Sequence, residues 1–129
     1  MSQQDLEIVV RLEQAMAKGD LKTAFADIDQ DLVLYEPSSL PWGGTHRGHQ
    51  AMIEAMQKLP VYWDFVGPPH IEARDAGDQI VIKVRFPVRS KKTGVSLDME
   101  MVELYKLVNG KVTEIKIFWY DTAAYLQEM

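Results

Sequence analysis

The chain has 129 residues, of which 47% are hydrophobic, and this excludes a disordered chain and predicts one globular domain over residues 1–129. The net charge of −5 disfavours nucleic acid as a partner, because an acidic protein repels a polyanion on average. The absence of cysteine excludes disulfides, thiol catalysis and cysteine-ligated metal centres.

No membrane-spanning segment is expected, since charged residues interrupt every long apolar run. The first residues, Met-Ser-Gln-Gln-Asp, lack the basic and apolar regions of a signal peptide. We therefore expect a cytoplasmic protein without a membrane partner, and the lack of cysteine is compatible with a reducing compartment.

The first half of the chain predicts three helices and one short strand. Apolar residues at helical spacing indicate the helices, and a short apolar run indicates the strand. In chain order, the expected elements are a helix over 5–18, a helix over 20–28, a strand over 32–36, a loop over 37–47 and a helix over 48–58. Gly19 is a natural stop for the first helix, Asp20 is suited to cap the second, and Pro37 ends the strand.

The second half predicts a series of strands and a last short helix. The expected elements are strands over 63–74, 79–89, 96–107 and 111–120 and a helix over 121–128, with Pro68 and Pro69 interrupting the first strand. Strict alternation of apolar and polar residues supports the strand over 79–89, and Asn109-Gly110 is a strong hairpin signal. The order predicts an α+β fold, with one curved sheet and helices packed on one side.

Four short motifs, taken with this order of elements, resemble one known family. They are Lys-Gly-Asp at 18–20, Glu-Pro at 36–37 with Arg-Gly at 47–48, Ala-Gly-Asp at 76–78, and Ile-Phe-Trp-Tyr at 117–120. Over nearly the whole chain they resemble the SnoaL-like polyketide cyclase family of the nuclear transport factor 2-like (ketosteroid isomerase-like) superfamily. The resemblance implies a cone-shaped, mostly antiparallel curved sheet wrapped around N-terminal helices, an internal apolar cavity, and a homodimer formed through the outer sheet face.

Glu36 is the first candidate catalytic residue. Alternation places it on the same face as Leu32 and Leu34, so it is expected to point inward beside the loop. Its position is similar to that of the general-base aspartate of ketosteroid isomerases. The alternative interpretation is a solvated glutamate at the end of a strand.

Glu103 is the second candidate. It alternates with Met99, Met101, Tyr105 and Leu107, and a lone carboxylate on such a face is costly unless it is paired or protonated. Its place resembles that of the isomerases' protonated aspartate, which donates a hydrogen bond to the oxyanion. The alternative is a structural buried carboxyl bonded to a Tyr, His or Arg side chain.

One departure from the isomerases limits the resemblance. These enzymes use a tyrosine on the first helix as the second oxyanion donor, and Leu12 stands at the matching position. The two-donor oxyanion hole is therefore incomplete, which disfavours true ketosteroid isomerase activity. Tyr35 and Tyr105 are the tyrosines that could supply a hydroxyl instead, although nothing in the sequence places them.

The remaining candidates lie in the loop and on the strands. His46 is a candidate proton shuttle and Arg47 a candidate carboxylate ligand, with surface loop residues as the alternative. Trp42 has little to pack on locally, so we expect it to close over a ligand or a partner subunit. The candidate substrate-binding residues are Tyr35, Trp42, Arg47, Trp63, Phe86, Met101, Tyr105, Ile117 and Trp119, each with plain core packing or surface exposure as the alternative. No metal is expected, since no carboxylate or third histidine stands at ligand spacing from His46 and His49. No cofactor is expected either, since the sequence has no phosphate-cradling loop or dinucleotide fingerprint.

Three hypotheses for function follow. The first is an acid–base enzyme, such as an isomerase, cyclase or dehydratase, that acts on a small apolar organic molecule with Glu36 as base and Glu103 as proton donor or polariser. The second is a non-catalytic binder of a hydrophobic small molecule. The third is a dimeric interaction module without a ligand.

Overall fold

Helix α1 (Ser2–Ala17) opens the computed structural model, which describes residues 2–129. Its apolar spacing buries Val9, Leu12 and Ala15 on one face, as the helical pattern predicts. The Asp20 side chain accepts a hydrogen bond of 3.2 Å from the backbone N–H of Thr23 and caps α2 (Leu21–Ala26). The second helix thus begins where expected and ends at Ala26, two residues before the predicted end.

The other elements follow in nearly the predicted order. They are β1 (Ile28–Glu36), β2 (Gly44–Arg47), α3 (Gly48–Gln57), α4 (Leu59–Tyr62), β3 (Trp63–Phe65), β4 (His70–Asp75), β5 (Ile80–Ser90), β6 (Ser96–Val108), β7 (Lys111–Trp119) and α5 (Thr122–Gln127). The predicted strand over 63–74 is divided into β3 and β4 at Pro68 and Pro69, which cannot donate ladder hydrogen bonds.

The prediction of an irregular loop over 37–47 is wrong for its last four residues. Residues 44–47 form β2, an edge strand that pairs antiparallel with β1. The prolines and glycines that disfavour regular structure all lie at or before Gly44, so the residues after them are free to pair with the exposed edge of β1.

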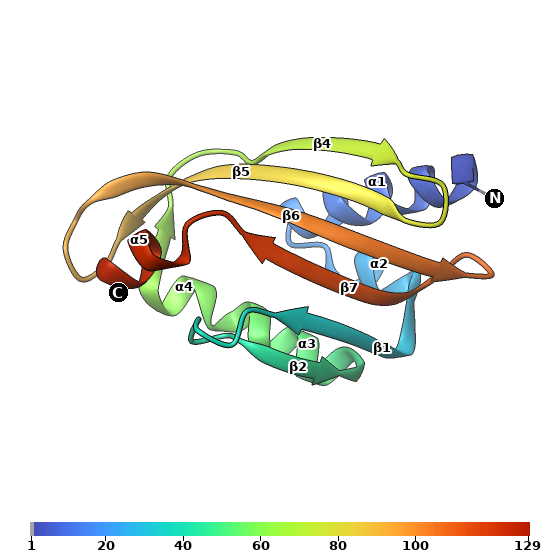
Figure 1. Cartoon of the computed structure of the whole chain (residues 1–129), viewed down its shortest axis with the longest axis horizontal. Helices are drawn as coiled ribbons and strands as arrows, with labels where there is room; N and C mark the ends of the chain where they lie inside the picture. Colours follow the sequence, from blue (N-terminus) through green and yellow to red (C-terminus); the bar gives the residue numbers. More distant parts are fainter. Residues whose placement is uncertain (1) are drawn as a thin grey trace.

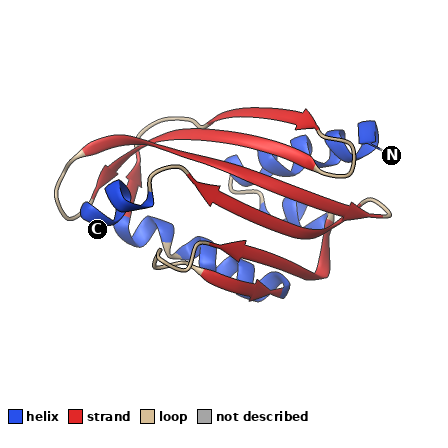
Figure 2. Ribbon diagram, in the orientation of Figure 1, coloured by secondary structure: helices blue, strands red, loops and turns tan. Residues whose placement is uncertain are grey.

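The strands form one curved, mostly antiparallel sheet, which confirms the predicted α+β fold class. The strand order is β2-β1-β7-β6-β5-β3, and β4 also pairs with β5. Only the β1–β7 pairing is parallel among the described strands. Helix α1 packs on β4 and β5, whereas α3 packs on β1 and β2 (Figure 1). Figure 2 shows the strands of the curved sheet in red and the helices that pack along it in blue.

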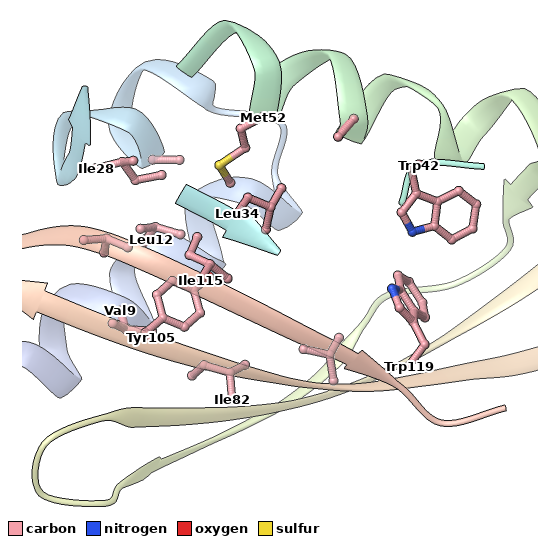
Figure 3. Close-up of a cluster of buried hydrophobic side chains, with 14 of the residues drawn as sticks. Val9, Leu12, Ile28, Leu34, Trp42, Met52, Ile82, Tyr105, Ile115 and Trp119 are labelled. Carbon is pink, nitrogen blue, oxygen red and sulfur yellow. The ribbon is translucent and has the colours of Figure 1, made fainter. Parts of the chain in front are cut away.

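Alternation along the long strands produces a buried inner face. On β5 the inner residues are Ile80, Ile82, Val84, Phe86 and Val88, all of them buried. The inner residues of β6 and β7, including Tyr105, Ile115 and Trp119, meet Leu12 from α1 and Leu34 from β1 (Figure 3). This shared core sets the distance between the sheet and the helices, and the cavity described below lies within it.

None of the helices described in residues 2–129 is long and apolar enough to cross a membrane.

Candidate functional site

A cavity of about 370 Å³ lies between the inner face of the sheet and helices α1, α3 and α4. Its wall is mostly apolar, but it includes three glutamates. The lining residues are Glu13, Met16, Leu34, Glu36, Trp42, Met52, Ala55, Met56, Leu59, Pro60, Phe65, Met101, Glu103, Tyr105, Ile115, Ile117 and Trp119. A cavity of this size and composition suits a small organic molecule that is largely apolar.

Glu36 is the last residue of β1 and lines this cavity, on the same face as Leu34. Its Oε1 accepts a hydrogen bond of 2.9 Å from the indole Nε1–H of Trp119 on the neighbouring strand β7. Burial raises the pKa of Glu36 to about 7, and the hydrogen bond from Trp119 opposes that rise by stabilising the charged form. Near neutral pH, the protonated and ionised forms of Glu36 are therefore similar in free energy.

Glu103 lies on the inner face of β6 and is 6% exposed. Burial is the main cause that raises its pKa well above the usual value, and the nearby carboxyl groups of Glu13 and Glu36 raise it further. These causes favour the protonated form of Glu103, an acid that can donate a hydrogen bond.

Glu13, on α1, is the partner of Glu103. The two carboxyl groups share a hydrogen bond, and the Tyr105 hydroxyl donates another to Oε2 of Glu13. Burial raises the pKa of Glu13, whereas these two hydrogen bonds lower it. Glu103 thus carries the proton of the pair and Glu13 accepts it, so that α1 and β6 together orient the Glu103 carboxyl group.

Glu13 was not among the predicted site residues, although its position in the sequence contains a signal for it. Glu13 stands four residues after Val9 and three before Met16, so helical spacing puts it on the buried face of α1. Glu13 is a lone carboxylate on an apolar helix face, just as Glu103 is a lone carboxylate on an apolar strand face. Met16, Met52 and Phe65 were also absent from the predicted binding set, although they line the cavity.

Of the predicted substrate-binding residues, five line the cavity: Trp42, Met101, Tyr105, Ile117 and Trp119. Trp42 differs from the expectation of a residue that closes over a ligand or a partner. It is 1% exposed, and its ring packs edge-on against Trp119 with 5.5 Å between the ring centroids. The loop turns inward at this point, so Trp42 is part of the cavity wall.

Three polar candidates lie outside the cavity lining. Tyr35 is directed to the opposite face of β1 because its neighbours Leu34 and Glu36 face inward. Arg47 is exposed at the start of α3. The Nε2–H of His46 donates a hydrogen bond of 2.9 Å to the backbone carbonyl of Trp42, so His46 holds the loop and has no contact with the cavity.

Trp63 and Phe86 also lie outside the lining, although both are buried. Trp63 opens β3 and pairs with Ser90 of β5. Phe86 packs between Phe65 and Trp119, with centroid distances of 5.7 and 6.0 Å. Both aromatics are packed in the hydrophobic core, as the alternative interpretation predicted, and Phe86 contacts two residues that line the cavity.

Among residues 2–129, no group of three or more His, Cys, Asp or Glu side chains is placed to hold a metal ion.

The family model of the SnoaL-like domain matches residues 9–115, which is more than half of the chain. No curated protein sequence matches the chain. Among solved structures, a nuclear transport factor 2-like protein of unknown function from Burkholderia pseudomallei is similar, with a TM-score of 0.81, 22% identity, and coverage of 97% of this chain and 96% of that one.

Two further solved structures share the fold. A candidate SnoaL-like polyketide cyclase from Mesorhizobium loti has a TM-score of 0.71 and 27% identity, over 87% of this chain and 96% of that one. TerC, co-crystallized with polyporic acid, has a TM-score of 0.78 and 19% identity, over 97% of each chain. With the matched domain and the curved sheet in agreement, this chain belongs to the SnoaL-like family of the nuclear transport factor 2-like superfamily.

Proposed function

We propose that this protein is an acid–base enzyme, an isomerase, cyclase or dehydratase, that acts on a small and largely apolar organic molecule without a cofactor. One observation carries the proposal. Glu36 and Glu103 line the same apolar cavity, and burial raises the pKa of both, to about 7 for Glu36 and well above the usual value for Glu103. Buried carboxyl groups with raised pKa values that share one cavity are candidates for acid and base roles.

Glu36 is the base in this proposal. A pKa near the working pH lets a carboxylate accept a proton from carbon or oxygen and return it within the same reaction. The hydrogen bond from Trp119 fixes the position of the accepting group on a rigid strand end. The wall is mostly apolar, and an environment of low polarity strengthens electrostatic interactions inside the cavity.

Glu103 is the acid. Its proton is held within the pair with Glu13, and the Tyr105 hydroxyl orients Glu13 from the other side. Where a substrate oxygen replaces Glu13 as the acceptor, the protonated carboxyl can donate its hydrogen bond or its proton to that oxygen as negative charge develops there. The structures of similar fold that include a candidate polyketide cyclase and a protein co-crystallized with polyporic acid agree with an organic substrate.

The test is turnover by a Glu36→Gln variant on a substrate found by screening apolar ketones, lactones and hydroxy compounds. Glutamine keeps the shape of the side chain and removes its basicity, so we expect kcat to fall about a hundredfold or more with little change in ligand affinity. Glu54→Gln, on the exposed side of α3, is the matched control and should keep full activity. Undiminished turnover by Glu36→Gln would overturn the proposal and favour a binding protein.

A further inference from the structure

Three buried side-chain atoms among the described residues lack a hydrogen-bond partner: Nε1 of Trp42, Nε1 of Trp63 and Oε1 of Glu103. Two of these atoms, on Trp42 and Glu103, belong to residues that line the cavity. A buried polar group without a partner is costly, and such a group beside a cavity is satisfied when a ligand brings the complementary atom. The apolar wall thus contains two polar positions that the protein itself leaves unmatched.

We propose that the indole N–H of Trp42 is a hydrogen-bond donor to the ligand, and that together with Glu103 it selects an uncharged molecule with a carbonyl group and a separate hydroxyl group. The carbonyl oxygen accepts from Trp42, and the hydroxyl pairs with Oε1 of Glu103. This inference rests on the proposed function, because it concerns the same cavity, and it narrows the substrate class.

The backbone around Trp42 holds the indole in place. The Gly43 N–H donates a 2.8 Å hydrogen bond to the Leu40 carbonyl, and the Trp42 carbonyl accepts from His46 at 2.9 Å. A Cβ atom at Gly43 would lie 2.1 Å from the Pro37 carbonyl oxygen, so this tight turn requires glycine. The N–H of Trp42 is therefore a donor fixed before a ligand arrives, which reduces the entropic cost of using it.

The direction of this donor fits the site. In Figure 3 the nitrogen of Trp42 lies on the side of the ring that faces Trp119. Trp119 is the residue that donates to Glu36, so both indole donors act in the same part of the cavity. A carbonyl that accepts from Trp42 is thereby brought toward the proposed base.

The charged residues that line the cavity disfavour a negatively charged ligand. Among the described lining residues there are three glutamates and no Lys, Arg or His. A carboxylate ligand would find no positive partner there and would be repelled by Glu36 in its ionised form. A hydroxyl group suits Oε1 of Glu103 in either protonation state, because a hydroxyl both donates and accepts.

Four probes of similar size separate these requirements: tetralin, 1-tetralone, 6-hydroxy-1-tetralone and 2-naphthoate. We expect 6-hydroxy-1-tetralone to bind about tenfold or more tightly than tetralin, because each satisfied buried group recovers part of its desolvation cost. We expect 1-tetralone to lie between them and 2-naphthoate to bind least well. Affinities are measured by isothermal titration or by quenching of tryptophan fluorescence.

The direct readout is the indole ¹H–¹⁵N spectrum of the wild-type protein, assigned with Trp42→Phe and Trp63→Phe. On binding 6-hydroxy-1-tetralone, the Trp42 proton should move downfield, whereas the Trp63 proton should stay in place. Trp63 is the matched control, since it is equally buried and unpaired but does not line the cavity. Trp42→Phe should lose about tenfold in affinity for 1-tetralone and little for tetralin, and Trp63→Phe should lose neither.

Several outcomes would overturn the inference: an unmoved Trp42 resonance, equal affinity for tetralin and 1-tetralone, tightest binding of 2-naphthoate, or no binding of any oxygenated probe at millimolar concentration. These readouts do not depend on turnover. If Trp42 donates to the probe while Glu36→Gln leaves turnover intact, the proposed acid–base function fails alone. If Glu36→Gln abolishes turnover while the Trp42 resonance stays unmoved, this inference fails alone.

Discussion

The indole Nε1–H of Trp119 donates a hydrogen bond of 2.9 Å to Oε1 of Glu36, across 83 residues of sequence. The two residues end β7 and β1, which pair in parallel, so both side chains reach the same edge of the sheet. The contact favours the charged form of Glu36, whereas burial favours the neutral form, and the balance gives a pKa of about 7. The environment of the proposed base therefore depends on one neighbouring side chain.

Trp119→Phe removes the donor and should raise the pKa of Glu36 above 7, because burial then acts without opposition. If Glu36 is the base, the rising limb of the pH profile of kcat/KM should move to higher pH in this variant. The pKa is measured by ¹³C NMR of the side-chain carboxyl, assigned with Glu36→Gln. Trp63→Phe, which removes an indole that does not contact Glu36, should leave both values unchanged, and an identical pKa in Trp119→Phe would contradict the argument.

The stability of the protein should fall as pH rises through the range in which Glu36 titrates. Its pKa is about 7 in the folded protein against 4.5 as the reference value, so the folded state binds more protons between these two limits. Protonation of Glu36 stabilises the folded state fully below pH 4.5, and this stabilisation is lost by about pH 7. The free energy of unfolding therefore decreases by about 3 kcal/mol over this range. The pKa values of Glu103 and Glu13 are also raised, so their titration also lowers the free energy of unfolding as the pH rises.

Denaturant unfolding at several pH values checks this prediction. Glu36→Gln cannot titrate at this position, so its free energy of unfolding should decrease less than that of the wild type between pH 5 and pH 8. Glu54→Gln, an exposed control, should follow the wild-type curve. Parallel curves for the wild type and Glu36→Gln would show that Glu36 is not the titrating group.

Glu103→Gln should change stability by less than about 1 kcal/mol at pH 7, because glutamine replaces a neutral acid of the same shape and its amide still donates to Glu13. Tyr105→Phe should cost more, about 1–3 kcal/mol, because it removes the hydroxyl that donates to buried Glu13. Denaturant unfolding of both variants makes the comparison. A Glu103 carboxyl that titrates near 4.5 by NMR would rule out its role as the acid.

We expect a homodimer formed through the outer sheet face. Val102 pairs with Phe118 across β6 and β7 on this face, next to Leu104, and Phe118 and Tyr120 are 48% and 78% exposed in the single chain. Apolar side chains gathered on a sheet face favour burial against a second copy. Light scattering at micromolar concentration should give a dimer, and Leu104→Glu should give a monomer with unchanged helix content.

Val95→Glu is the control for this experiment, since Val95 is exposed in the turn before β6 and outside the outer face. That variant should remain dimeric. A wild-type protein that is monomeric at the same concentration would contradict the prediction.

The sequence by itself determined most of the elements and the direction of side chains within them, although β2, α4 and the first residues of β1 were not predicted. Alternation on β5 and β6 predicted which residues face inward, Glu103 among them, and Asn109-Gly110 predicted the hairpin, where both residues have positive φ. Asp20 predicted the start of α2. These features depend on the few residues around each position, so the local pattern is sufficient to show them.

The tertiary structure alone decided which inward-facing residues surround the cavity and what state they are in. Glu13 meets Tyr105, which is 92 residues away, and Trp42 is directed inward by a loop whose turn depends on Gly43. Alternation gives Trp119 and Phe86 the same inward direction, yet only Trp119 lines the cavity. The boundary of a cavity and the pKa of a carboxyl depend on how distant elements close together and exclude water, and no local sequence pattern contains that information.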